Sequence, residues 1–482
     1  ARPSVGTARP QVQLPFGHLE TDTVERVKVA VVGGGITGLA VAYELHQQGV
    51  HFRLFETSGR LGGLILTEKH NGFTIDAGPD SLLVQKPSAI ELCQELGLGE
   101  RLQTTLIPRT AYILKKGVLH ALPETSVLGI PTRLTPLFTS GLLSPLGRLR
   151  FALDLILPRK HMASLEDESI ADFFTRRFGK ESVDYVAEPL LATIHAGDVN
   201  RLSMRALFPR LLEAEQSHGS LIRGLNRRGT APMADGMFRS LPGGLGEMTE
   251  ALVSALPPER LSPSTRVISI DDNGPFVVRT TGDNTIASAV ILAIPASGVT
   301  VLLEAQHPTL AKRCLDIPHN STATVALTYP RSAIKHTLLG SGFVVPRVET
   351  GLSIIAATWV SSKWPDRAPA GQVLIRAFIG GARNPDILNR IPNDKDLAQL
   401  AHRNLARILK IECDPQFSRV YRWRNRSPQY EVGHLERLAS IDHELRHTPS
   451  LFITGTSFRG IGIPDCIADG RATARAAARM VQ

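Results

Sequence analysis

The sequence predicts an α/β protein whose nucleotide-binding domain is assembled from segments that lie far apart along the chain. Three observations support this prediction. An apolar, β-branched stretch at 27–32 predicts a buried parallel strand, and it leads into a glycine-rich turn and an Ala/Leu-rich helix. Glycine turns, helices and buried strands return at 239–297 and at 440–482. The regions between these segments are strand-rich or Leu/Pro-rich, as expected of inserted domains.

The turn after the first strand carries Gly33, Gly35 and Gly38 in G-x-G-x-x-G spacing. The first two glycines permit a tight turn and the close approach of a pyrophosphate, and the third lets the helix pack closely on the strand. The phosphates then meet the helix N-terminus, where free N–H groups favour negative charge. Glu56 ends the next strand, about 20 residues along, where an acid binds a ribose and disfavours the 2′-phosphate of NADP. A purely structural turn is the alternative, and the order of strand, glycines, helix, strand and acid argues against it.

Composition and charge exclude several function classes. The 482 residues are 43% hydrophobic and 21% charged, which is ordinary for a globular protein of roughly two to three domains. The four cysteines show neither metal-ligand spacing nor a disulfide framework, so we expect no metal site and a reducing compartment. Much of the net charge of +9 falls in residues 101–160, where nine Lys/Arg face two acidic residues. No nucleic-acid motif accompanies this charge, so we expect no nucleic-acid partner.

Two stretches fall outside this pattern. Residues 1–26 lack periodicity and have the character of an N-terminal arm or a tag, so we expect them to lie outside the domains. The Leu/Pro-rich segment 124–160 has its longest uncharged run at 134–147, which is shorter than the about 20 residues that a membrane span needs. We expect this basic, apolar segment to lie on an anionic membrane surface, and a helical subdomain that packs on itself is the alternative.

Local signals predict further elements in chain order. A helix at 84–99 begins after a proline and ends at a glycine, and a hairpin at 111–121 turns at Lys116–Gly117. Acidic residues early and basic residues late predict a helix at 164–180.

The second half of the chain continues this alternation of elements. Residues 188–198 form an apolar element that ends in a glycine turn, and 205–225 begins as a helix and passes into a Gly/Arg-rich loop. Short strands and a helix at 396–410 share the region 298–430, which predicts a mixed sheet covered by helices. An Ala/Arg-rich helix at about 465–480 ends the chain.

Longer stretches carry a more specific signal: GGGITGLAVAYEL, SGRLGG, DAGPDSLL, EPLLATIHAGDVNRLSMRALFP, LPGGLGEM, PQYEVGH and GTSFRGIGIPDCIADG. With these stretches the chain resembles the family of oxygen-dependent protoporphyrinogen oxidases and coproporphyrin-forming coproporphyrinogen III oxidases, which are FAD-dependent and related to amine oxidases. The resemblance covers most of residues 27–480. The fourth stretch matters most, because general amine oxidases share the nucleotide motifs but lack this one.

The resemblance implies a Rossmann-like FAD-binding domain built from discontinuous segments, with an inserted mixed-sheet substrate domain and a helical, membrane-associating domain. The expected boundaries are 27–87, 239–297 and 440–482 for the FAD-binding domain, 109–123, 211–238 and 298–439 for the substrate domain, and 88–108 and 124–210 for the helical domain.

The resemblance also implies FAD contacts in the glycine turn, the R-x-G-G loop and the C-terminal segment. The expected residues are Gly33, Gly35, Gly38, Glu56, Arg60, Gly62, Gly63, Gly78, Val267, Gly455, Gly462, Ile463, Pro464 and Asp465. The helix that begins near Pro464–Asp465 would point its positive end at the flavin, and an ordinary C-terminal helix is the alternative. Cys466 lacks the setting of a covalent flavin attachment and is expected to be a packed residue.

The implied activity is the oxidation of protoporphyrinogen IX to protoporphyrin IX in haem biosynthesis, in three two-electron steps through FAD, with molecular oxygen as acceptor and peroxide as product. Coproporphyrinogen III is the alternative substrate. An amine oxidase or carotenoid desaturase on the same scaffold is a more remote alternative. So is a non-enzymatic lipid carrier, against which the intact Glu56 and R-x-G-G argue. No catalytic side chain is expected beyond FAD, because the cofactor carries out the hydride transfer.

Five residues are candidates for substrate binding. Leu327 and Phe343 align with positions that sandwich a pyrrole ring in the family, and a core position is the alternative for both. Thr193 and His195 lie in the loop that meets the substrate in relatives, although Thr193 stands where a glycine is usual and His195 is as compatible with a structural role. Arg109 is offered as the partner of a propionate, on the same face of the strand as Ala111.

The resemblance implies a porphyrinogen and molecular oxygen as partners. We expect a cytoplasmic protein with peripheral contact at the inner face of the cell membrane. The sequence leaves a homodimer open.

Overall fold

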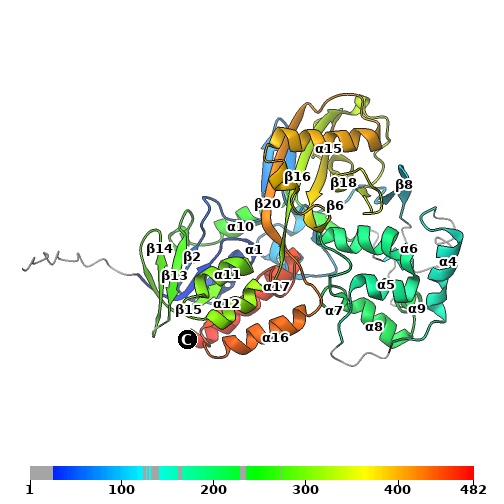
Figure 1. Cartoon of the computed structure of the whole chain (residues 1–482). Helices are drawn as coiled ribbons and strands as arrows, with labels where there is room; N and C mark the ends of the chain where they lie inside the picture. Colours follow the sequence, from blue (N-terminus) through cyan, green and yellow to red (C-terminus); the bar gives the residue numbers. More distant parts are fainter. Residues whose placement is uncertain are drawn as a thin grey trace, which may run out of the picture.

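The computed structural model describes residues 25–122, 126–127, 130–131, 141–160, 166–227, 235–272 and 274–482. The described chain forms three lobes (Figure 1). One contains a mainly parallel sheet between helices, the second contains a mixed sheet covered by α15 (Asp394–Leu409), and the third is helical. The predicted α/β class is therefore confirmed.

Seven strands of the described chain form the first sheet, in the order β12-β2-β1-β15-β14-β13, and β21 also pairs with β15. They are β1 (Glu25–Val32), β2 (Phe52–Phe55), β12 (Leu261–Ser262), β13 (Val267–Asp271), β14 (Phe276–Thr280), β15 (Thr285–Leu292) and β21 (Leu451–Ile453). The strands β12, β2, β1, β15 and β21 pair with their neighbours in parallel. The strand β14 pairs antiparallel with both β15 and β13. Strands from the beginning, middle and end of the chain thus share one sheet.

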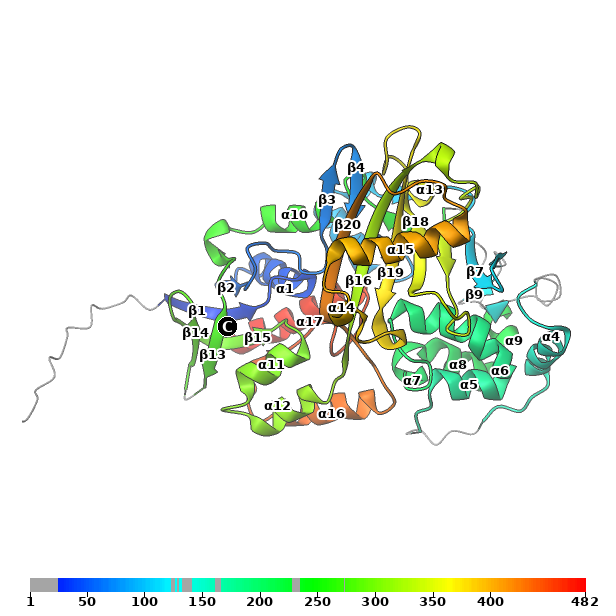
Figure 2. The same cartoon turned by 45° about the horizontal axis from the view of Figure 1, so that its top comes forward.

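Helices cover both faces of this sheet, because alternate residues of each strand point to opposite sides. Val29 and Val31 pack with α1, α2, α10 and α17, whereas Ala30 and Val32 pack with α11, α12 and α16. The bounds are α1 (Ile36–Gln47), α2 (Ser88–Glu95), α10 (Gly246–Ser254), α17 (Ile463–Val481), α11 (Ala296–Leu303), α12 (Pro308–Leu315) and α16 (His434–Leu445). Figure 2 shows α1 and α17, from opposite ends of the chain, in the same lobe, where they contact each other.

The second sheet has the order β20-β16-β19-β18-β17-β7-β8. Its strands are β7 (Ala111–Lys115), β8 (Val118–Ala121), β16 (His319–Pro330), β17 (Gly342–Val344), β18 (Ile354–Trp359), β19 (Gln372–Gly380) and β20 (Phe417–Pro428). The hairpin β7–β8 turns at Lys116 and Gly117, both with positive φ, as predicted. Residues of α15 and of the sheet's outer face form one apolar cluster, which leaves the other face toward the first lobe.

The third lobe consists of short helices around an aromatic core. They are α4 (Pro145–Ala152), α5 (Ile170–Phe178), α6 (Lys180–Ser182), α7 (Met204–Leu207), α8 (Pro209–His218), α9 (Leu221–Arg227), the 3-10 turn Leu153–Leu155 and the π-helix Val183–Ala192. The predicted helix at 164–180 starts only at Ile170, because the hydroxyl of Ser169 caps it there. The prediction of a loop in the later part of 205–225 was wrong. Two helices, α8 and α9, occupy this region, and Gly219 (φ +69°) lies between them.

Shorter elements complete the described chain: β3 (Thr67–His70), β4 (Phe73–Asp76), β5 (Leu82–Leu83), β6 (Gln103–Thr104), β9 (Ser126–Val127), β10 (Ile130–Pro131), β11 (Phe238–Ser240), α13 (Val360–Lys363), α14 (Ile387–Arg390) and 3-10 turns at Gly99–Arg101, Pro258–Arg260, Arg331–Ala333 and Gly381–Arg383.

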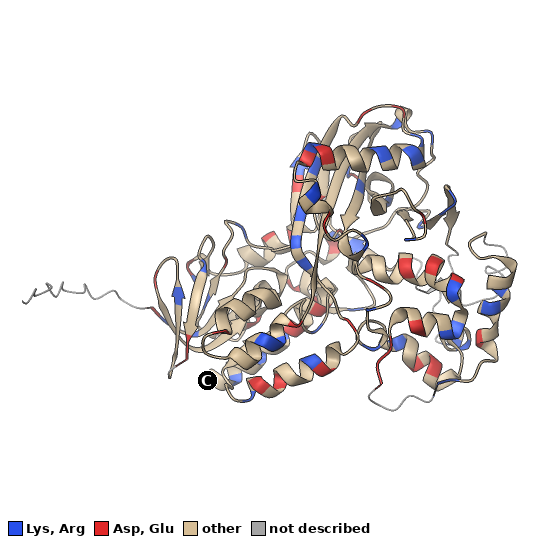
Figure 3. Ribbon diagram, viewed as in Figure 1, with Lys and Arg blue, Asp and Glu red and all other residues tan. Residues whose placement is uncertain are grey.

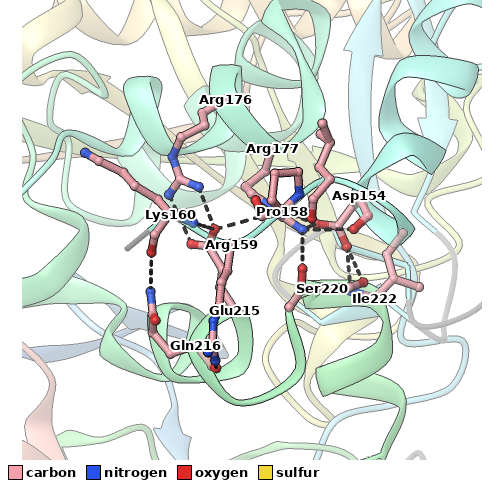
Figure 4. A network of polar contacts seen from close by, with 12 residues as sticks. Asp154, Pro158, Arg159, Lys160, Arg176, Arg177, Glu215, Gln216, Ser220 and Ile222 are labelled. Atoms are coloured by element: carbon pink, nitrogen blue, oxygen red, sulfur yellow. Dashed lines mark hydrogen bonds and ion pairs between the residues drawn. The ribbon is translucent and has the colours of Figure 1, made fainter. Parts of the chain in front are cut away.

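A buried ionic network ties the helices of the third lobe together (Figure 4). Arg177 is 1% exposed and donates through Nε to Asp154 at 2.8 Å, and it also lies 3.5 Å from Glu215. Arg176 pairs with Glu215 and with Glu168. These contacts join α5 to α8 and to the turn after α4.

The basic stretch 101–160 uses several of its charges within the protein. Arg150 donates to three backbone carbonyls at the end of α5, and Lys115 donates to the carbonyl of Leu142. Figure 3 shows acidic and basic residues interspersed over this lobe. Much of the uncharged run 134–147 lies outside the described residues. Among the described helices, none is both long enough and apolar enough to cross a lipid bilayer.

Candidate active site

The glycine turn between β1 and α1 has the geometry that its spacing predicts. Gly33 has φ +109°, which a residue with a side chain rarely adopts. A Cβ on Gly38 would lie 1.8 Å from the carbonyl oxygen of Gly33, so only glycine lets α1 start this close to the strand. Gly35 is the N-cap of α1, and no side chain of the described chain caps this end. The first N–H groups of α1 are therefore available to an anion.

Glu56 lies beside this turn, at the end of β2. Its carboxylate accepts hydrogen bonds from the backbone N–H of Gly34 at 2.7 Å and of Ser58 at 2.8 Å. The loop before β13 bonds to it as well, because the N–H of Thr265 donates to the carbonyl of Glu56 at 2.8 Å. Val267 starts β13 two residues later, so the structure brings Val267, an expected FAD contact, close to Glu56, the predicted partner of a ribose.

The R-x-G-G loop folds onto the glycine turn. Gly62 forms a β-bridge with Gly35, and its N–H donates to the carbonyl of Gly34 at 2.7 Å. The guanidinium of Arg60 donates to the carbonyls of Gly63 and Ile65, so this side chain shapes the loop. A direct contact of Arg60 with the cofactor stays a prediction.

The C-terminal segment reaches the same place from the other end of the chain. Gly462 is the N-cap of α17 and, like Gly35, has no side-chain cap among the described residues. Thr37, in the first turn of α1, meets α17 at two points. Its side chain is hydrogen-bonded with the thiol of Cys466 near the start of α17, and its carbonyl would lie 2.7 Å from a Cβ on Gly470, so α1 and α17 start close together. Ile463, Pro464 and Asp465 form the first turn of α17. Two helix N-termini with free N–H groups thus lie side by side.

The segment after β4 completes the site, and Arg376 of β19, which sequence reasoning missed, holds it in place. A Cβ on Gly78 would lie 2.1 Å from the carbonyl of Leu64, next to the R-x-G-G loop. Arg376 on β19 is 2% exposed, donates to the carbonyls of Asp76 and Gly78, and pairs with Asp80 at 2.8 Å. Burial opposes ionisation of Asp80, but the charges of Lys363 and Arg376 outweigh it and hold its pKa well below the usual range. This cluster fixes the second sheet against the cofactor lobe.

This is the arrangement of a protein that binds a dinucleotide at the carboxyl ends of parallel strands. A family model described as flavin containing amine oxidoreductase matches residues 36–478, and the chain belongs to that family.

Named relatives match over nearly the whole chain. The chain is 35% identical to a coproporphyrinogen III oxidase of Bacillus subtilis (strain 168), over 92% of this chain and 96% of the relative. It is 28% identical to protoporphyrinogen oxidase 2, chloroplastic/mitochondrial, of Arabidopsis thaliana, over 94% of each. A crystal structure of a candidate protoporphyrinogen oxidase from Exiguobacterium sp. 255-15 superimposes with a TM-score of 0.82 at 31% identity, over 94% of this chain and 98% of that one.

The chain is therefore an oxidoreductase with FAD as its cofactor, and the residues present fit that group. The uncapped start of α1 suits the pyrophosphate, Glu56 suits a ribose, and the start of α17 suits an electron-rich ring edge. Cys466 behaves as the packed residue expected: it is 1% exposed, and burial raises the pKa of its thiol to about 12. No group of His, Cys, Asp or Glu able to hold a metal occurs among the described residues.

Lys86 is a second residue that sequence reasoning missed. Its ammonium lies 2.6 Å from Asp465 in the first turn of α17. Its positive charge also contributes to lowering the pKa of His195, in the loop after the π-helix. Lys86 and Asp465 are 379 residues apart in sequence, so no local pattern identifies the pair. Lys86 thus pairs with the first turn of α17, and its positive charge disfavours protonation of His195.

The surroundings of His195 favour a neutral imidazole, and its contact with substrate stays a prediction. Burial, together with the positive charge of Lys86, lowers the pKa of His195 to about 4, and its Nδ1 is buried without a hydrogen-bond partner among the described residues. A neutral imidazole can offer a hydrogen bond to a propionate, but no ion pair. Thr193 ends the π-helix, half-buried, with its hydroxyl 3.5 Å from the carbonyl of Glu188.

The predicted ring-sandwiching residues require a correction. Leu327 is 0% and Phe343 2% exposed, and both belong to the apolar cluster beneath α15, on the outer face of the second sheet. They are core residues, which was the alternative. Phe378, by contrast, lies on the inner face of β19 with Arg376 and is half-buried. The alternation of side chains along a strand shows which residues share a face of the sheet. It does not show which face α15 covers, so the sequence alone could not separate Leu327 and Phe343 from Phe378.

Arg109 also differs from its prediction, because β7 begins at Ala111 and Arg109 precedes it. Its Nε donates to the hydroxyl of Thr105 at 2.9 Å, and its side chain passes close to Gly236. The expectation that it shares a strand face with Ala111 was therefore wrong, and a propionate contact stays a prediction.

Proposed function

We propose that this protein oxidises a porphyrinogen with molecular oxygen through FAD, and that coproporphyrinogen III is its preferred substrate. The observation that carries the proposal is the match over more than nine-tenths of the chain to relatives named for these two reactions. Sequence reasoning put protoporphyrinogen first. The order is reversed here because the relative named for coproporphyrinogen III is the more similar of the two.

The chain's own residues serve this function by binding and orientation. FAD, when bound, supplies the acceptor for a hydride in each two-electron cycle. The free N–H groups at the start of α17 favour negative charge there by about 1 kcal/mol. Arg376 holds the segment from Asp76 to Asp80 in place, and Phe378 offers an apolar wall on the same face. We assign no proton transfer to a side chain.

Fluorescence of the porphyrin formed, followed together with oxygen consumption, tests the proposal. The holoenzyme is given each reduced porphyrinogen in parallel, and we expect a kcat/KM about tenfold higher for coproporphyrinogen III, equivalent to about 1.4 kcal/mol of preference. A reversed ratio would support the protoporphyrinogen alternative. Oxidation of amines with no porphyrin formed would exclude both.

The same assay tests Arg109 as the partner of a propionate. Arg109→Ala should raise KM more than it lowers kcat, because a propionate contact is largely the same in the ground state and the transition state. Arg279→Ala, which removes an exposed arginine from β14, is the control and should change neither constant. An unchanged KM in Arg109→Ala removes the assignment.

We also propose peripheral contact with an anionic membrane through the start of the helical lobe. Leu146 and Leu149 of α4, and Ile156 just after the 3-10 turn that follows it, are 79%, 60% and 75% exposed. Several nearby arginines and lysines are engaged internally, so the apolar side chains would supply most of the binding.

Co-sedimentation with phosphatidylglycerol vesicles tests this contact. Changing all three residues to serine should reduce binding to the background level, since about 1.5–3 kcal/mol accompanies burial of each side chain and the three together change the binding constant by about a thousandfold or more. Val301→Ser with Leu315→Ser removes two comparably exposed apolar side chains from α11 and α12 and serves as control. Equal binding of both variants, or none by the unmodified protein, contradicts the proposal.

A further inference from the structure

The segment from Gln429 to His434, between β20 and α16, contacts both the cofactor segment and the predicted substrate loop. In Figure 1 and Figure 2 the orange chain leaving β20 passes beside α7 on its way to α16. Its sequence belongs to PQYEVGH, a stretch for which the proposed reaction supplies no role. Two of its side chains, Tyr430 and His434, are 4% and 0% exposed.

The side chains of this segment hold the loop that leads into α17. The hydroxyl of Tyr430 donates to the carbonyl of Thr456 at 2.7 Å and accepts from the N–H of Gly460 at 2.8 Å. The ring of His434 stacks on that of Tyr430 with centroids 3.8 Å apart, and its Nε2 donates to the carbonyl of Phe458 at 3.1 Å. The loop from Thr456 to Gly460 is therefore bonded at three points by two side chains.

The rest of the segment is bonded to the helical lobe. The N–H of Ser203 donates to the carbonyl of Tyr430 at 2.8 Å, and the N–H of Val432 donates to the carbonyl of Arg201 at 2.8 Å. The side-chain amide of Gln429 donates to the carbonyl of His195 at 2.9 Å. One short segment thus links the loop that carries His195 to the loop that sets the start of α17.

The loop before α17 needs such support. Gly460 has φ +128°, and a Cβ there would lie 2.4 Å from the Cβ of Asp465 in the first turn of the helix. Glycine confers no conformational preference of its own on a loop. A single hydroxyl satisfies both a donor and an acceptor of this loop, so its loss leaves two half-buried backbone groups without this partner.

We propose that Tyr430 is a positioning residue for the flavin: its hydroxyl fixes the loop before α17 and so sets where the free N–H groups of that helix face the ring. The inference rests on FAD as cofactor and is independent of which porphyrinogen is oxidised. His434 supports the same loop through Phe458. The linkage through Gln429 makes the geometry at the flavin sensitive to the position of the His195 loop.

Tyr430→Phe tests the proposal, with Tyr329→Phe as matched control. Tyr329 is 0% exposed, and its hydroxyl bonds to His402 at 3.0 Å beneath α15, far along the fold from the start of α17. Each variant removes one buried tyrosine hydroxyl. The measurements are the visible absorption spectrum and midpoint potential of the holoprotein, and the dissociation constant of FAD from titration of the apoprotein.

We expect Tyr430→Phe to lower the midpoint potential, shift the flavin spectrum and weaken FAD binding about tenfold, the scale of one lost buried hydrogen-bonding group. Tyr329→Phe should leave all three unchanged, although both variants lose comparable thermal stability. His434→Phe, which keeps the ring stack and loses the donor to Phe458, should shift the potential in the same direction.

The proposal is overturned if Tyr430→Phe matches Tyr329→Phe in spectrum, potential and FAD affinity while both are folded. It is equally overturned if the potential shifts as much in the control. None of these readouts requires a porphyrinogen, so a failed substrate assignment leaves the test intact.

Discussion

Arg177→Met is expected to lower the free energy of unfolding of the helical lobe by about 3–5 kcal/mol, because it leaves the buried carboxylate of Asp154 without its countercharge, whereas Glu215 keeps Arg176. Asp154 and Glu215 are both 0% exposed. The guanidinium of Arg177 also donates to the carbonyls of Asp154 and Gly219, each at 2.9 Å, so one side chain joins three segments (Figure 4). Methionine fills similar space but supplies no donor.

Urea unfolding followed by far-UV circular dichroism measures this loss. Lys180→Met is the control, since it breaks the exposed ion pair with Asp184 one turn away and should cost at most about 0.5 kcal/mol. A loss below about 1 kcal/mol in Arg177→Met would show that the network contributes little, and that the aromatic core holds this lobe alone.

The network also explains why the charge of the helical lobe is a poor guide to its partners. The excess of basic residues at 101–160 contributed to the prediction that this region contacts an anionic membrane. In the fold, Arg150 caps the end of α5 and Arg159 donates to the carbonyl of Gln216. A charge count records the residues present, but only the fold shows which of them face solvent.

The cofactor half of the site was predictable because its signals are local. Gly33, Gly35, Gly38 and Glu56 belong to one βαβ unit, in which each residue type follows from a backbone requirement. The helix at the C-terminus was equally visible from its glycine and proline.

The substrate half was less predictable, because its geometry depends on long-range packing. Arg376 and Gly78 are 298 residues apart in sequence, and nothing near either residue indicates their contact. Leu327 and Phe343 are apolar strand residues that fit either face of a sheet, and α15 covers the face they occupy. Arginines interrupt the apolar pattern of β20, so its sequence carries only a weak strand signal. Arg419 and Arg422 find acidic partners on other elements.

Gly38→Ala is expected to weaken FAD binding by roughly 10–100-fold, the effect of about 1–3 kcal/mol of overpacking. Its Cβ would lie 1.8 Å from the carbonyl oxygen of Gly33, so α1 must move away from the turn and its N–H groups leave the pyrophosphate. The measurement is the dissociation constant of FAD by fluorescence titration of the apoprotein, with the thermal unfolding of the apoprotein recorded beside it. Gly282→Ala is the control, because its Cβ would meet only the hydroxyl of Thr280 at 3.7 Å. If Gly38→Ala bound FAD as tightly as the control, the phosphates would not lie at the start of α1. The convergence of α1 and α17 would then need another explanation than a shared dinucleotide.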